Sequence, residues 1–209
     1  MKLVNTFDKY ETGGIKLYHI KQDKRSIQSS NWIYHALINL LEEKEYTEIT
    51  IKELVNTAKL GRATFYRNFD SIDDVLRLKC NEAFKDLYEY IINCHKQLMI
   101  YDPNSKFILL KPFFTYWYDD SSIIEQLIKA NKIDILNNSF INMLASFSTN
   151  LDIESKGILK YKDYFVVSIT ALSISILVQW IKDKKNIEPD ALYDIVTKQI
   201  FNLRDLLVI

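Results

Sequence analysis

Residues 50–69 constrain the fold of this chain more than any other stretch, because their pattern predicts two short helices joined by a tight turn. Thr50 and Glu53 stand three positions apart, as the two members of a capping box do, so a helix is expected to begin after Thr50. Apolar residues then recur at helical spacing and would give this helix one buried face: Leu54, Val55 and Ala58.

A second short helix is expected to follow Gly61, which suits the position before a first helical turn. Leu60 and Phe65 have the spacing of a hydrophobic staple around that start. Phe65 and Phe69 share one face of this helix, because residues four positions apart are neighbours on a helix surface. Both rings are therefore expected in the core.

The same segment is locally basic. Within residues 51–69, four cationic side chains accompany a single acid, Glu53: Lys52, Lys59, Arg62 and Arg67. The whole chain has 27 basic and 27 acidic side chains and a formal net charge of zero, so any contact with nucleic acid must come from a local patch. A short basic helix pair has the size and charge of a helix-turn-helix that enters a major groove.

These residues resemble the DNA-binding signature of the TetR/AcrR family of transcriptional regulators. That signature opens its second helix with Thr, here Thr50, and continues with an Ile/Leu–Ala pair, here the Leu-Val at 54–55. Its third helix has a Thr-Phe/Leu-Tyr-x-x-Phe run, which stands here at residues 64–69. The resemblance covers residues 25–80 and includes residues 71–76, which are similar to the start of the family's fourth helix.

The resemblance implies an all-α protein. We expect a flexible N-terminal arm over residues 1–24, a three-helix helix-turn-helix DNA-binding domain over residues 25–70, and a helical ligand-binding and dimerisation domain over residues 71–209. It also implies the DNA contacts, with Arg62 the best candidate for recognition of a guanine. Phosphate contacts are expected mainly from Thr50, Lys52, Tyr66 and Asn68, and base-edge contacts from the start and middle of the third helix, at Arg62, Ala63, Thr64 and Arg67.

The sequence departs from the family pattern at three positions. Glu45 and Lys59 stand in turns where the family usually or often has Gly, and a left-handed backbone at a non-Gly residue costs about 1 kcal/mol. Some members also offer a Lys to the phosphate backbone at the start of the fourth helix, where this chain has Ile72. We therefore expect no phosphate contact at that position.

Beyond this segment, apolar spacing and capping residues predict further helices. The first precedes the signature and the others follow it: residues 26–44, 71–100, 122–131, 133–148, 158–182 and 189–207. Aromatic side chains in the later part could form the core, line a pocket for an apolar or aromatic ligand, or do both. Six of them are the candidate ligand contacts: Phe113, Tyr116, Trp117, Phe140, Phe147 and Tyr164.

Residues 164–181 contain no charged side chain and approach the length of a membrane span. Their serines and Gln179 favour a helix that is buried against its own domain and a second subunit, so we expect no membrane contact. In the family the last two long helices of each subunit form a four-helix dimer interface. Here those helices would be residues 158–182 and 189–207.

No metal, cofactor or enzyme activity is expected. Cys80 and Cys94 would lie about 21 Å apart on one helix, too far for a disulfide, which fits a reducing cytoplasm. The adjacent Cys94 and His95 point about 100° apart on a helix, and no further ligand is spaced to join them. The sequence also lacks a nucleophile–base pair and a phosphate-binding Gly loop.

The function implied is a cytoplasmic, ligand-responsive repressor that binds a palindromic operator as a homodimer. A ligand in the C-terminal domain would move the helix at residues 71–100 and change the separation of the two recognition helices. A transcriptional activator, or a co-regulator or protein-interaction module with little DNA binding of its own, remains an alternative on the same fold.

Overall fold

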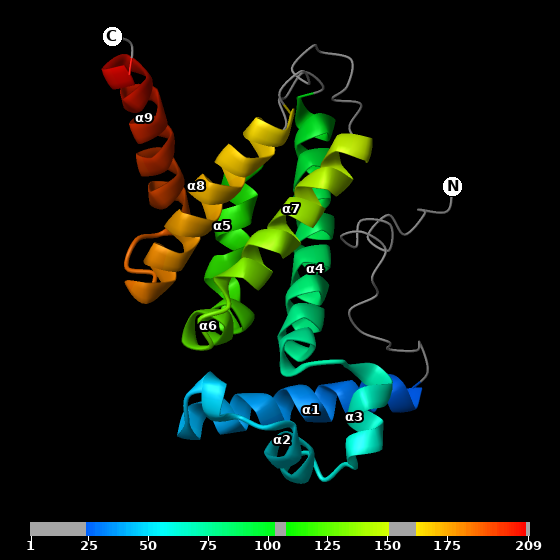
Figure 1. Cartoon of the computed structure of the whole chain (residues 1–209). Helices are drawn as coiled ribbons and strands as arrows, with labels where there is room; N and C mark the ends of the chain where they lie inside the picture. The colour runs from blue at the N-terminus through cyan, green and yellow to red at the C-terminus, as the bar shows by residue number, and fades with distance from the viewer. Residues whose placement is uncertain (1–23, 103–107, 151–161, 208–209) are drawn as a thin grey trace. The chain divides into compact units, whose positions relative to one another are not determined.

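The computed structural model describes residues 24–102, 108–150 and 162–207, and these residues form helices and no strand (Figure 1). The expected all-α fold is therefore confirmed. The predicted arm at residues 1–24 lies almost entirely outside the described residues, and Lys24 already belongs to the first helix. The chain divides into two compact units. The first contains residues up to Phe84 together with Ser122–Thr170, and the second contains Lys85–Ser121 together with Ala171 onward. The expected domain boundary at residue 70 stays a prediction.

The first unit begins with α1 (Lys24–Glu43), a short 3-10 helix (Tyr46–Glu48), α2 (Ile51–Thr57) and α3 (Arg62–Asn68) (Figure 1). Both predicted short helices are present, and Gly61 is the N-cap of α3 as expected. Thr50 and Glu53 form the predicted capping box. The side chains that fill this part of the core are fully buried: Ile33, Leu37, Leu54, Phe65 and Phe69.

In the turn between α2 and α3, Lys59 stands where the family often has Gly, and its backbone is left-handed, with a φ of 55°. The hydrogen bonds of this turn end α2: the Lys59 N–H donates to the Asn56 carbonyl at 3.0 Å, and the Leu60 N–H donates to the Val55 carbonyl at 2.8 Å. Glu45, at the other turn where the family usually has Gly, has a different backbone conformation. Glu45 has an extended backbone (φ −66°, ψ 145°) and caps the 3-10 helix, so that turn needs no glycine.

We expect Lys59→Gly to raise the free energy of unfolding by about 0.5–1 kcal/mol, because glycine adopts a positive φ without the strain of a Cβ. The matched control is Lys52→Gly, at an exposed position within α2. There glycine should lower stability by about 1 kcal/mol. Urea denaturation of the full chain, followed by circular dichroism, compares the two variants. A loss of stability in both would show that the Lys59 backbone is not strained.

The first unit also contains the first half of α4 (Ile72–Tyr101), α6 (Ser122–Lys129) and α7 (Ile133–Asn150). As predicted, a helix starts at Ser71: the Ser71 N–H and hydroxyl donate to Asp74 Oδ2 at 2.8 and 2.9 Å. Two ion pairs then connect the α6–α7 region to the helices before it. Lys129 Nζ lies 2.9 Å from Glu42 Oε1 of α1, and Lys132 Nζ lies 2.8 Å from Asp73 Oδ2 of α4.

Asp73 is the centre of this connection. Burial alone would raise the pKa of its carboxyl, but hydrogen bonds from Lys132 and from the Tyr46 hydroxyl outweigh it and hold that pKa below its usual value. Burial and the bond to Asp73 in turn raise the pKa of Tyr46, so the phenol remains a donor. The 3-10 helix, the start of α4 and the α6–α7 turn are thereby joined through one carboxylate.

The second unit contains the rest of α4, α5 (Leu110–Asp119), most of α8 (Lys162–Lys182) and α9 (Pro189–Leu207). The sequence did not predict α5 as a separate helix. Its rings pack with α8, since Trp180 lies 5.9 Å from the Phe114 ring and stacks on Tyr118. Lys185, after α8, donates to the Tyr118 carbonyl at 2.9 Å and to Ser121 Oγ at 3.0 Å.

Among the described residues, only the helix from Asp163 to Lys182 is long and apolar enough to cross a membrane by length and composition. Several of its side chains are exposed in the single chain, Tyr164 by 75%, Phe165 by 59% and Val167 by 61%. The two cysteines both lie on α4 and are free.

Candidate nucleic-acid interface

The third helix has one buried and one exposed face. Phe65 and Phe69 are completely buried, with ring centroids 5.7 Å apart, and fix α3 to the core. The opposite side carries Arg62, Ala63 and Arg67, all exposed, and Tyr66, whose side chain is 54% exposed. The core rings thus position a polar, cationic face on the outside of a short helix.

Six of the eight predicted DNA contacts are exposed in the structure. Thr50 and Lys52 lie at the start of α2, and the other exposed residues lie on α3: Arg62, Ala63, Tyr66 and Arg67. Thr64, also on α3, is half-buried. The structure therefore places the predicted residues in two groups, one at the start of α2 and one along the whole of α3.

Thr50 has a capping role. Its hydroxyl donates to Glu53 Oε2 at 2.9 Å and accepts the Glu53 N–H at 3.3 Å. The hydrogen bond from Lys44, and those from Thr50, lower the pKa of Glu53 to about 2. Lys44 Nζ lies 2.7 Å from Glu53 Oε1, so the single acid of residues 51–69 is offset by a cation from outside that segment.

The eighth predicted contact, Asn68, is only 1% exposed, so we assign its side chain to the interior and not to a phosphate. Its amide nitrogen donates to the Thr64 carbonyl at 3.0 Å and to Ser29 Oγ at 3.3 Å. Its oxygen accepts the Ser26 hydroxyl at 2.6 Å. Asn68 therefore fixes the end of α3 against α1, and it orients the exposed residues of α3 without facing outward itself.

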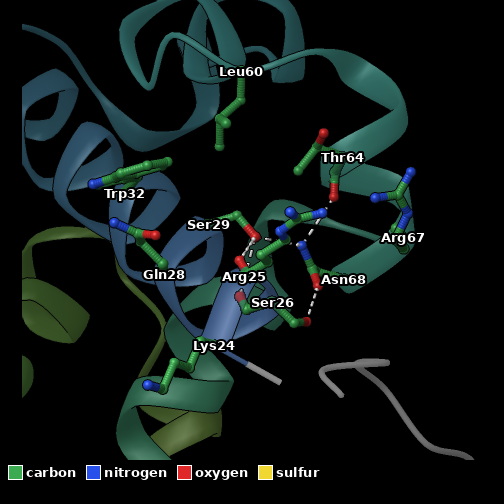
Figure 2. Close-up of a pocket in the computed structure, with 10 residues that line it drawn as sticks. All are labelled: Lys24, Arg25, Ser26, Gln28, Ser29, Trp32, Leu60, Thr64, Arg67 and Asn68. Atoms are coloured by element: carbon green, nitrogen blue, oxygen red, sulfur yellow. Dashed lines mark hydrogen bonds between the residues drawn. The ribbon is translucent and has the colours of Figure 1, made fainter. Parts of the chain in front are cut away.

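A groove with a volume of about 910 Å³ lies between α1 and α3 (Figure 2). Its cations are Lys24 and Arg25 from the first turn of α1 and Arg67 from α3, and none of the described residues that line it is acidic. In Figure 2 the side chains of Gln28 and Trp32 project from α1 on one side, and Thr64 and Arg67 from α3 on the other.

From the sequence, Lys24 and Arg25 could belong to a solvated tail or to a basic arm against DNA, and neither they nor Gln28 and Trp32 were among the predicted contacts. The available signal was Trp32, a large ring beside the apolar stripe of α1 and not in it. It is 48% exposed. A cationic groove with amide, hydroxyl and aromatic groups suits the phosphates and sugars of a nucleic-acid backbone.

At the start of α4, Ile72 is half-buried and is followed by Asp73 and Asp74. This turn supplies no cation of its own, so phosphate binding would depend on α1, α2 and α3.

The candidate ligand residues are distributed over both units. Phe113 and Trp117 are buried in the second unit and Phe140 and Phe147 in the first, while Tyr116 is half-buried and Tyr164 is largely exposed. None of the six lines the cavity of about 580 Å³ in the second unit.

Comparison with known families gives one match, between residues 33–78 and the model described as bacterial regulatory proteins, tetR family. The matched residues run from α1 through α3 into α4, and they include the exposed cationic face of α3. Neither the curated proteins nor the solved structures contain a significant match.

Proposed function

For this member of the tetR family of bacterial regulatory proteins, a DNA-binding transcriptional regulator, we propose the role of a ligand-responsive repressor that binds a palindromic operator as a homodimer. The observation that carries the proposal is the exposed face of α3 beside a groove whose described lining has three cations and no acid. In this reading Arg62, Thr64 and Arg67 read base edges. Lys52, Tyr66 and the two cations at the start of α1 bind phosphates.

A homodimer is proposed because one recognition helix of seven residues contacts few base pairs. A twofold dimer would read two half-sites about 34–36 Å apart, or a multiple of that distance. The exposed apolar side chains of α8, Tyr164, Phe165 and Val167, together with the 41% exposed Ile195 of α9, support these two helices as the dimer contact. The same contact would explain why α8 is so apolar in a protein that we propose to be cytoplasmic.

Ligand response is proposed through α4, a continuous helix that begins beside α3 and ends in the second unit. A ligand changes DNA affinity only if it binds the DNA-competent and DNA-incompetent states with different affinity. Operator occupation that blocks transcription would make the protein a repressor, with release by ligand.

The test is the salt dependence of binding to a duplex of arbitrary sequence, measured by fluorescence anisotropy. Each phosphate neutralised contributes about −0.9 to the slope of log K against log salt concentration, so contacts from two protomers should give a slope steeper than about −4. Replacing Lys24 and Arg25 by Gln should reduce the slope by about 2–4 in a dimer. The matched control is Lys85→Gln at an exposed position of α4, which should leave the slope unchanged.

A flat salt dependence, shared by all three proteins, would contradict DNA binding through this groove. It would favour the alternative, a protein-interaction module on the same fold. Sedimentation of the free protein, in the same buffer, tests the dimer separately.

A further inference from the structure

A second concave site lies entirely within the second unit and belongs to none of the DNA-binding elements. It has a volume of about 580 Å³ and is formed by the C-terminal half of α4, the start of α5 and the beginning of α9. On α4, Tyr90, Cys94 and Leu98 follow one another at intervals of four and share one helix face. On α5, Lys111 and Thr115 have the same spacing.

The walls of this cavity are mainly aromatic and aliphatic. Tyr90 stands against the Tyr116 ring at 5.6 Å, which gives the α4 wall an aromatic backing, and Ile108 and Pro112 supply the α5 side. Such a slot fits a flat apolar body, because ligand sites of this kind combine apolar walls with a few placed polar groups.

Among the lining residues that the structure describes, Lys111 is the donor that carries a positive charge, and its ion pair with Asp190 lies at the edge. Lys111 Nζ lies 3.1 Å from Asp190 Oδ2, and the two side chains are 48% and 71% exposed. In this described part of the lining, Asp190 is the only carboxylate, and it already faces Lys111. Exposed pairs of this type contribute little to stability, so an incoming anion could replace Asp190 at small cost.

We propose that this cavity binds a small aromatic molecule with one anionic group, a carboxylate or sulfonate, which displaces Asp190 from Lys111. The aromatic body lies between the α4 stripe and the start of α5, and the anion accepts hydrogen bonds from the Lys111 ammonium group. A cationic ligand is disfavoured, because its only carboxylate partner would be Asp190, which Lys111 already neutralises.

The exchange has a consequence for α9. Asp190 is the second residue of α9, and its pairing with Lys111 joins the start of that helix to α5. Just before α9, Glu188 accepts the Tyr118 hydroxyl at 2.9 Å and forms a second connection to α5. Release of Asp190 would loosen the first connection while the second remains. This step deepens the proposed ligand response and rests on it, because α9 is one of the two helices proposed to form the dimer.

The experiment is a fluorescence titration of the full chain with 1-anilinonaphthalene-8-sulfonate, an anionic aromatic dye, in the absence of DNA. Lys111→Met should weaken binding about ten-fold, because a charge-assisted hydrogen bond is lost. Asp190→Asn should instead tighten binding several-fold, because the internal competitor for Lys111 is gone. The matched control, Lys85→Met at an exposed position of α4 outside the cavity, should bind as the unchanged protein does.

Opposite effects of the Lys111 and Asp190 substitutions support the proposal, since dye on exposed apolar surfaces elsewhere would respond to neither. Equal titrations for all four proteins would overturn it. The proposal would also be overturned if proflavine, a cationic aromatic dye, bound more tightly than the anionic dye and if Asp190→Asn abolished that binding. Since these titrations contain no DNA and the salt experiment contains no dye, a failure of this site is distinguishable from a failure of the DNA-binding function.

Discussion

Alanine in place of Phe65 is expected to lower the free energy of unfolding by about 3–5 kcal/mol, the usual cost of removing a buried aromatic ring. Phe65 has no exposed surface, and its ring contacts Phe69 and Tyr66 with centroids 5.7 and 5.5 Å away. The loss should appear in urea denaturation followed by circular dichroism, and DNA binding should fall with it.

The neighbouring aromatic residue supplies the control. Tyr66 is 54% exposed, and Tyr66→Ala should change stability by less than about 1 kcal/mol, because little apolar area is lost. It should nevertheless weaken DNA binding at temperatures where the protein is fully folded. Similar stability losses for the two variants would contradict the orientation of α3 described above.

Arg62→Ala is expected to lower affinity for the operator by about 1–3 kcal/mol per half-site, the usual value of a bidentate arginine–guanine contact. Arg62 is the first residue of α3 and is exposed, so its replacement should not disturb the core. The loss should be specific: the variant should no longer distinguish the base pair that Arg62 reads. Anisotropy titrations against the operator, and against operators altered at single positions, measure both effects.

Lys52→Ala is the matched control for Arg62, since Lys52 is also exposed at the start of a helix but is assigned to a phosphate. It should weaken binding to every sequence by a similar factor and lower the salt slope by about 1 per protomer. If Arg62→Ala behaved in the same uniform way, Arg62 would be a phosphate contact and the base reading would have to come from other residues of α3.

The local features of the motif could be predicted from the sequence because they depend on residues three to five positions apart. The Thr50–Glu53 capping box and the Ser71–Asp74 cap before α4 are of this kind, and both are present in the structure. The turn at Lys59 was marked instead by the family resemblance, because the family often has Gly there, and its left-handed backbone comes from the structure.

Asn68 could not be placed in this way, because its environment comes from distant residues. Ser26 and Ser29, which bind its amide group, precede it by 42 and 39 positions. A polar residue at the end of a basic helix was naturally interpreted as a DNA contact. Only the packing of α1 against α3 shows that its hydrogen-bonding groups are used inside the domain.

The second unit was predicted less well for a related reason. Its aromatic residues are spaced closely enough to suit either core or pocket, so the pattern did not locate a ligand site. The helix α5 was not separated from its surroundings, and its role emerged only from contacts with distant residues such as Trp180 and Lys185. The ion pair at the edge of the cavity connects Lys111 and Asp190, which are 79 positions apart, and no local sequence pattern indicates this pairing.

The most direct test of the central claim is selection of bound fragments from a genomic DNA library at moderate salt, with the unchanged protein and Arg62→Ala in parallel. The account predicts enrichment of an inverted repeat whose half-sites lie about 34–36 Å apart, or a multiple of that distance, and loss of the enrichment in the variant. Recovery of no common sequence, with the two proteins behaving alike, would contradict sequence-specific DNA reading by α3.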